Sequence, residues 1–205
     1  QDVVLRENFC SEAMRLAQLL IENDQTNGPH VNALFALMCF HASRFKARKN
    51  EKGEMILYED QDETLWDHEL IAKGSYHLHQ ASQGDKISKY HLEAMIAYWN
   101  TQKQDTKEKW ENILQLYNRL LQLEYSPVAA LNRTYALSKA NGKEQAITEA
   151  EKLNLTGNHF YFTLLGELYT VIDNKKAKQN FENALSLAKT QTDKLTIRKK
   201  IDKLN

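Results

Sequence analysis

The chain has 205 residues, among them only 2 prolines and 7 glycines. A β-sandwich or β-barrel of this length would need many more turn-forming residues, so the composition favours helices. Basic and acidic residues both number 27, so no overall charge attracts nucleic acid or an anionic membrane.

Neither a membrane span nor secretion is indicated. No stretch approaches the roughly 18 consecutive apolar residues of a membrane span, and no basic-then-apolar signal opens the chain. Cys10 and Cys39 each lie in an apolar helical pattern, which favours two buried thiols in a reducing compartment over a disulfide. We therefore expect a cytoplasmic protein without membrane contact. Because the sequence starts at Gln1 without methionine, we expect it to be part of a longer protein.

Apolar residues recur at helical spacing along nearly the whole chain. The pattern predicts helices at 4–23, 30–47, 63–83, 88–102, 107–123, 127–140, 143–154, 158–172, 175–190 and 193–203. Ser126-Pro127 is typical of a helix start, and Asn141-Gly142 is typical of a helix end. Short turns separate most of these helices, which forces neighbours to pack antiparallel.

One pattern recurs about every 33 residues, the period of tetratricopeptide repeats. Three helices carry apolar or small residues spaced by four and then three: Ile113-Tyr117-Leu120, Ala146-Ala150-Leu153 and Ala177-Phe181-Ala184. The helices before the second and third sets match as well, with Leu131, Asn132 and Tyr135 against Leu165, Gly166 and Tyr169. Small residues let two helices approach closely, and the aromatic residue fills the groove of the next pair. The predicted fold is therefore all-α, a right-handed stack of antiparallel helix pairs, or tetratricopeptide-like α-solenoid.

Two regions follow from this division. Residues 1–105 form an N-terminal helical region with an irregular acidic loop at 48–62, and residues 106–205 form the repeats. We expect the two to continue as one domain. Within the loop, residues 55–58 are predicted to form a short extended segment that lies against the helices.

No motif for catalysis, metal binding or phosphate binding is present. His77 and His79 are two residues apart, which places their rings on different sides of a helix. The acidic stretch 59–69 lacks the central glycine of a calcium-binding EF-hand loop. We therefore predict no catalytic residues, no metal site and no cofactor, and the protein is not expected to be an enzyme.

Four segments together resemble a known group of proteins. They are the helix end with Arg44 and Arg48, LYEDQDETLWD (57–67), YHLEAMIA (90–97) and SPVAALNRTYAL (126–137). In this order they resemble the C-terminal extension of a group of bacterial extracytoplasmic-function sigma factors. That group carries a tetratricopeptide-like domain after its two promoter-reading domains. The opening NFCSEAMRLAQLL (8–20) is similar to the first helix of the extension, so the resemblance spans nearly the whole chain.

The resemblance supplies candidate protein-interaction residues. The family motifs fall on Arg44, Arg48, Glu59, Asp60, Gln61, Asp62, Trp66, Asp67, Asn132 and Arg133. The family's usual arginine after Asp-Gln-Asp is Glu63 here, a reversal of charge. If that arginine pairs with an acidic partner in the family, the same pair cannot form in this protein.

The resemblance implies a regulatory or protein-interaction domain that modulates transcription initiation. Its partners would be the sigma domains upstream of Gln1 or the core RNA polymerase, and this part of the protein would make no direct DNA contact. The alternative hypothesis is a stand-alone tetratricopeptide adaptor that binds a partner peptide in its concave groove. A helix-turn-helix encoded upstream of Gln1 would support the first hypothesis, and a signal peptide or nothing at all there would support the second.

The acidic stretch 59–67 has two compatible interpretations. In the first, Asp60, Gln61 and Asp62 offer acceptors to a basic partner surface, while Arg44 and Arg48 brace the loop from below. In the second, the loop only closes the N-terminal half, with Asp62 capping a helix and Trp66 buried.

Overall fold

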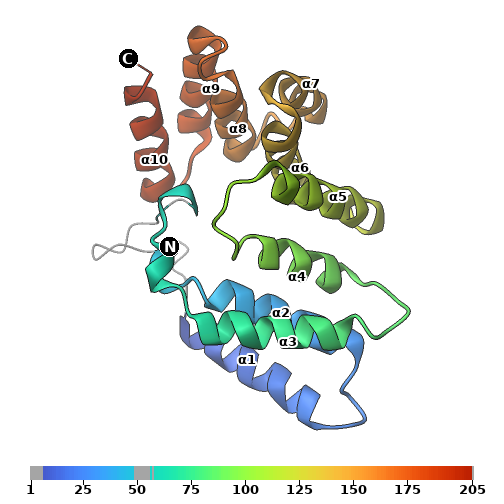
Figure 1. Ribbon diagram of the computed structural model, residues 1–205. Coiled ribbons are helices and arrows are strands. Elements are labelled where there is room, and N and C mark those ends of the chain that lie inside the picture. The colour runs from blue at the N-terminus through green and yellow to red at the C-terminus, as the bar shows by residue number, and fades with distance from the viewer. Residues whose placement is uncertain (1–6, 49–55, 57, 205) are drawn as a thin grey trace. The chain divides into compact units, whose positions relative to one another are not determined.

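The computed structural model describes residues 7–48, 56 and 58–204, and these fold into helices and short 3-10 turns without a strand (Figure 1). The α-helices are α1 (Glu7–Glu22), α2 (Pro29–Ala42), α3 (His68–Ala81), α4 (Lys89–Trp99), α5 (Lys107–Leu123), α6 (Pro127–Asn141), α7 (Lys143–Leu153), α8 (His159–Tyr169), α9 (Asn174–Leu187) and α10 (Gln191–Asp202). The 3-10 turns are η1 (Lys46–Arg48), η2 (Tyr58–Asp60) and η3 (Glu63–Leu65). The prediction of an all-α fold is confirmed.

The chain divides into two compact units between Gln104 and Asp105. The N-terminal unit contains α1 to α4 with the three 3-10 turns, and the C-terminal unit contains α5 to α10. The sequence-based division into regions lies next to this boundary. Each unit has its own packed helices, and we describe each by itself.

In the N-terminal unit, α2 is the central helix. Most of its residues are apolar, as expected for a helix with several neighbours, and it packs against α1, α3 and α4. Its Phe35, Cys39 and Phe40 are almost fully buried. Gly74 of α3 permits the close approach, because a Cβ at this position would lie 2.8 Å from Cε1 of Phe40.

A buried hydrogen bond links α2 to α3 and continues to the turn before α2. Nδ1 of His77 lies 2.8 Å from Oδ1 of Asn32, whose Nδ2 donates to Oδ1 of Asn27 at 2.7 Å. Because the asparagine oxygen can only accept, Nδ1 of His77 is the donor. Burial lowers the pKa of His77, and the nearby charge of Lys73 adds to the effect.

In the C-terminal unit, each helix packs mainly on the helices before and after it, and α6 also contacts α8. Contacts between such near neighbours are typical of helical-repeat arrays. The predicted repeat positions Ala146, Ala150, Ala177 and Ala184 have no exposed surface. The clearest contact is between α8 and α9, where a Cβ on Gly166 would lie 2.5 Å from Cδ1 of the Phe181 ring.

Several predicted helix ends are confirmed in detail. The hydroxyl of Ser126 accepts from the Ala129 amide and Pro127 opens α6. Gly142 ends that helix at a φ of 99°, a conformation that glycine adopts without strain. Pro127 and Gly142 are therefore local signals that tertiary contacts do not override.

Other predicted boundaries are wrong. The second helix was expected to reach residue 47 but ends at Ala42, where the Ser43 hydroxyl donates to the Phe40 carbonyl and the Ser43 carbonyl accepts from the Asp67 amide. The third was expected from residue 63, but α3 starts at His68. Tyr58 opens a 3-10 turn and is not extended. Met55 and Leu57 of the predicted extended segment lie outside the described residues.

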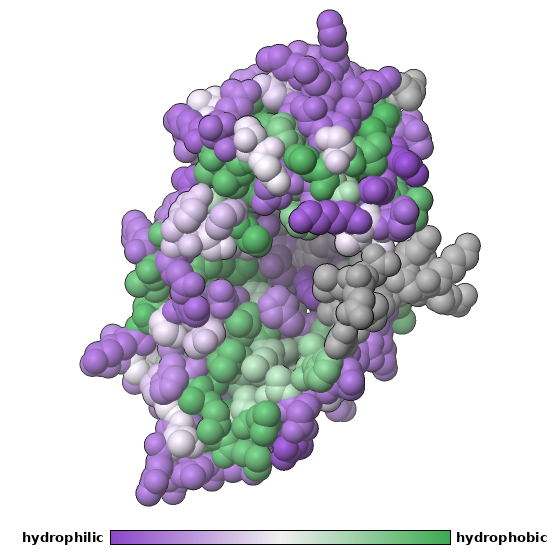
Figure 2. Space-filling model, turned by 180° about the vertical axis from the view of Figure 1, so that it is seen from behind, coloured by the Kyte–Doolittle hydropathy of each residue, from purple (hydrophilic) through white to green (hydrophobic). Residues whose placement is uncertain are grey.

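None of the described helices has the length and apolar character needed to cross a bilayer. Figure 2 shows hydrophilic side chains over much of the visible surface, broken by apolar patches. Of the tryptophans, Trp66 and Trp110 are buried as expected, while Trp99 is only partly buried. Cys39 is buried, Cys10 is partly exposed, and both thiols are free.

The Gly166→Ala variant tests the close approach of α8 and α9. Helix propensity alone would make this change stabilising, by up to about 1 kcal/mol. We expect the opposite, a loss of about 1–3 kcal/mol in the free energy of unfolding, because the new methyl overlaps the buried Phe181 ring. Urea unfolding measures the change. Gly157→Ala is the control, since its Cβ would meet nothing within 4 Å, and equal effects of both changes would contradict the close packing.

Because the pKa of His77 is lowered, we expect the free energy of unfolding to decrease in acid. Its folded pKa is lowered, so below about pH 6.5 the unfolded chain takes up a proton that the folded chain does not. Stability is therefore full above the unfolded pKa and falls as the pH drops below it. We expect wild type to lose more unfolding free energy between pH 7 and 5.5 than His77→Asn, whose amide keeps a donor for Asn32. Equal losses would show that His77 does not titrate with folding.

Candidate protein-interaction site

The acidic segment, residues 58–69, has an acidic outer face and an anchoring inner face. It consists of η2, η3 and the first turn of α3. Gln61 and Trp66 point inward and are only 6% and 5% exposed. The carboxylates face solvent: Glu59, Asp60, Asp62, Glu63, Asp67 and Glu69.

Lys103 holds the backbone of the acidic segment. Its Nζ donates to the carbonyls of Tyr58, Glu59 and Gln61 at 3.3, 3.2 and 2.8 Å. The Tyr58 hydroxyl donates to the carbonyl of Gln102 at 3.2 Å. Hydrogen bonds from an ammonium group are stronger than those from a neutral donor. Lys103 thus donates to backbone carbonyls and not to the carboxylates on the outer face.

Arg44 supports the same segment through its aromatic rings. The guanidinium carbon lies 5.1 Å from the centre of the Tyr58 ring and 5.8 Å from the Trp66 ring, within the range of cation–π attraction. Its Nη1 donates to the Asn100 carbonyl at 3.2 Å. Burial lowers the pKa of Arg44 to about 10, with the charge of Arg48 adding to the effect. The guanidinium therefore remains charged at neutral pH, beneath the acidic face.

Arg48 contributes differently. Its backbone carbonyl accepts from the Ile56 amide at 2.9 Å, which connects η1 to the approach of the acidic segment. Its Nη2 lies 3.4 Å from Nδ1 of His41 on α2. Burial also lowers the pKa of Arg48. Of the two arginines, only Arg44 stacks on the rings of the segment in the described residues.

Two aspartates shape the ends of the segment. Oδ1 of Asp62 accepts from the hydroxyl and the amide of Thr64 at 2.7 and 2.9 Å, and these bonds lower the pKa of Asp62. Oδ1 of Asp67 accepts from the Leu70 amide at 3.0 Å and so caps α3. Asp62 therefore caps a helix as expected, but the helix is the 3-10 turn η3, and α3 is capped by Asp67. Buried Trp66 has an extended backbone, which separates the turn capped by Asp62 from α3.

Gln61 and Trp66 anchor the segment mainly by burial. Nε2 of Gln61 donates to the Ile56 carbonyl at 3.3 Å. Within the described residues, Oε1 of Gln61 and Nε1 of Trp66 have no hydrogen-bond partner. Of the matched motif residues in this segment, these two face the interior, while Glu59, Asp60, Asp62 and Asp67 face solvent.

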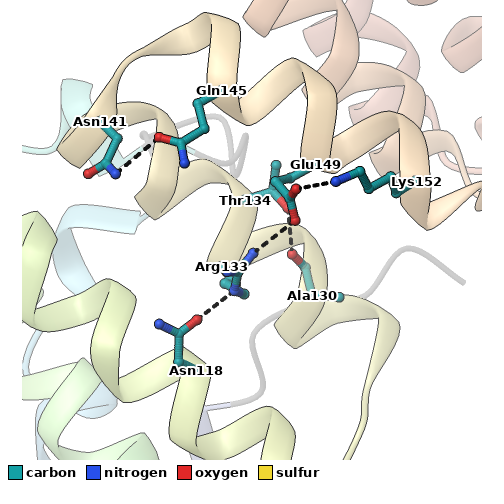
Figure 3. A network of polar contacts seen from close by, with 8 residues as sticks. All are labelled: Asn118, Ala130, Arg133, Thr134, Asn141, Gln145, Glu149 and Lys152. Atoms are coloured by element: carbon teal, nitrogen blue, oxygen red, sulfur yellow. Dashed lines mark hydrogen bonds and ion pairs between the residues drawn. The ribbon is translucent and has the colours of Figure 1, made fainter.

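Arg133 lies in the C-terminal unit and ties three of its helices together (Figure 3). Its Nε donates to Oδ1 of Asn118 on α5 at 2.6 Å, and its Nη1 lies 3.9 Å from Oε2 of Glu149 on α7. Arg133 is half-buried, whereas Asn132 is exposed. The role that these contacts support for Arg133 is packing between repeats, and Asn132 alone of this pair presents its side chain to solvent.

The exposed carboxylates of the acidic segment can bind a basic partner electrostatically. No group of three or more His, Cys, Asp or Glu side chains in the described part of the chain is placed to hold a metal ion. Lys103 and Tyr58 were missed at the sequence level. Lys103 lies more than 40 residues from the carbonyls that it binds, and no local pattern identifies so distant a donor.

The comparisons relate the chain to proteins of unknown function. Residues 1–82 match the model of a family of unknown function, DUF6596. The chain is 32% identical over 201 residues to an uncharacterised protein of Rhizobium meliloti (strain 1021), and the match covers 96% of this chain and 47% of that protein. The chain thus spans about half the length of the curated relative that it matches. No solved structure matches significantly. The resemblance to sigma factors therefore stays a prediction.

Lys103→Met tests how the acidic segment is held. Removing the ammonium leaves three carbonyls without their donor, so we expect the free energy of unfolding to fall by about 1.5–3 kcal/mol. Amide hydrogen exchange should also become faster across residues 58–66. Lys178→Met, at an exposed lysine of α9, is the matched control. Unchanged exchange in Lys103→Met would mean that burial of Trp66 alone fixes the segment.

Proposed function

We propose that this chain is a regulatory, protein-interaction domain of an extracytoplasmic-function sigma factor. The acidic segment is its contact with a basic surface of the sigma domains or the core RNA polymerase. The observation that carries the proposal is the division of the segment into buried anchors and exposed carboxylates. A recognition surface needs side chains that remain available on a backbone that does not move, and Lys103 and Arg44 supply that support from inside.

The charge pattern favours a basic partner. From Glu59 to Asp67 the exposed side chains include five carboxylates and no lysine or arginine. Such a patch accelerates association with a basic surface and disfavours acidic ones. Leu65 is 45% exposed within the same segment, so the partner would combine basic residues with an apolar contact.

Two further points support a place within a longer protein. The family motifs recur here in order, on both units, and the acidic stretch matches at Glu59, Asp60, Gln61 and Asp62. The Rhizobium relative is about twice as long as the region that this chain matches, which leaves room in that protein for other domains. Glu63, which replaces the family's usual arginine, has an exposed side chain. It therefore extends the acidic patch and does not disturb packing.

The decisive experiment reverses the charge of two residues of the acidic segment and keeps the residues that cap η3 and α3. Asp60→Lys combined with Glu63→Lys changes two exposed carboxylates and spares Asp62 and Asp67. In the full-length gene product, we expect promoter-dependent transcription with core RNA polymerase to fall about tenfold at low salt. The difference should shrink at high salt, because ions screen exposed charges.

The control reverses two exposed carboxylates elsewhere, Asp24→Lys and Glu182→Lys. Circular dichroism and the melting temperature of both double variants must match wild type. Equal transcription by wild type and the Asp60 and Glu63 variant would reject the acidic segment as the contact. A parent gene without a promoter-reading domain would reject the sigma-factor assignment and leave the adaptor hypothesis.

A further inference from the structure

A groove in the N-terminal unit has no part in the proposed docking of the acidic segment. It has a volume of about 490 Å³ and lies between α3, the connection 82–88 and α4. Leu78, Ile87 and Met95 supply apolar wall, and His79, Lys86 and Tyr98 supply polar groups. Pockets of roughly 300–1,000 Å³ are the size that holds small organic ligands.

His91 lies in the wall of the groove and both of its ring nitrogens are hydrogen-bonded. Its Nδ1 accepts from the Ser88 amide at 3.1 Å, so its Nε2 carries the proton and donates to the Ala81 carbonyl at 3.2 Å. These bonds join the end of α3 to the start of α4. Gly84 lets the connection between them pack closely against Pro29, since a Cβ at Gly84 would lie 2.7 Å from Cγ of Pro29. These contacts hold the connection that forms one wall of the groove in place.

Most polar groups in the wall are already satisfied within the protein. The Ser75 hydroxyl donates to the Ile71 carbonyl at 2.9 Å, and the Ser82 hydroxyl donates to the His79 carbonyl at 2.7 Å. By contrast, the side chains of His79, Lys86 and Tyr98 have no hydrogen-bonding or ionic partner among the described residues. No carboxylate lines the groove. The remaining polar groups can all donate a hydrogen bond, and one of them is a cation.

We propose that this groove binds a single-chain organic anion, with its acidic head at Lys86 and its alkyl chain between Leu78 and Met95. An apolar wall removes the alkyl chain from water, at a gain of about 0.8 kcal/mol for each buried methylene. The ammonium of Lys86 then selects an anionic head over a cationic one. This site is independent of the sigma-factor assignment, because it depends only on the N-terminal unit.

Sodium decanoate is the probe, used below its micellar concentration with the ¹⁵N-labelled chain. We expect saturable amide shifts that centre on Ser75, Ser82 and Ile87. Decyltrimethylammonium, with the same chain and the opposite charge, should bind about tenfold more weakly. Sodium acetate, which has the head without the chain, should give no saturable shift.

Variants connect the binding to the named residues. Lys86→Glu should weaken decanoate binding about tenfold, whereas Lys178→Glu, on α9, should leave it unchanged. Met95→Trp should abolish binding by filling the groove. If that variant unfolds, Ile87→Asp serves the same purpose, because Ile87 is 44% exposed and tolerates a polar side chain.

Three results would overturn the proposal. One is equal decanoate affinity in Lys86→Glu and wild type. Another is equal affinity for the anionic and cationic alkyl probes, which would indicate non-specific apolar contact. The third is no saturable binding of decanoate, or shifts that centre on another part of the chain.

Discussion

Close approach between neighbouring helices is the constraint on which both units depend. In the C-terminal unit the Phe181 ring lies against the backbone at Gly166, and in the N-terminal unit the Phe40 ring lies against Gly74. In both contacts a large ring fills space that any side chain at the glycine would occupy. Protein interiors are packed as tightly as organic crystals, so each contact fixes the spacing of its helix pair. A glycine packed against a phenylalanine ring therefore occurs within each unit.

The acidic segment depends on that framework. Arg44 follows α2, Asn100 and Lys103 follow α4, and α2 packs against α4. The cations that hold Tyr58 and the segment backbone therefore sit on helix ends whose separation is set by the core. Placing cations under an acidic surface also reduces repulsion between the carboxylates. A partner would consequently meet a shaped acidic face and not a flexible acidic tail.

The groove between α3 and α4 arises from the same packing. Both helices pack against α2, and residues of both helices and of the connection between them line the groove. His91 lies in its wall, where Ser88 and Ala81 are hydrogen-bond partners of its two ring nitrogens.

The sequence by itself determined the helical class, the repeat spacing in the second half and several helix ends. These properties depend on neighbours along the chain: apolar residues at helical spacing, Pro127 at a helix start and Gly142 at a helix end. It also placed the carboxylates of residues 59–69 in one exposed stretch, since charged side chains rarely become buried. It misplaced the start of α3, because Asp62 and Asp67 are equally good caps when read locally. Only burial of Trp66, with its extended backbone, decides between them.

Tertiary structure alone decided what holds the acidic segment and what Arg133 does. Lys103 reaches carbonyls more than 40 residues earlier, and Arg133 joins Asn118 and Glu149 from two other helices. The identity of a lysine or an arginine shows that it can donate hydrogen bonds, but not which acceptors the fold will bring near. Those partners are set by how the helices pack, which depends on the shapes of all the buried side chains together.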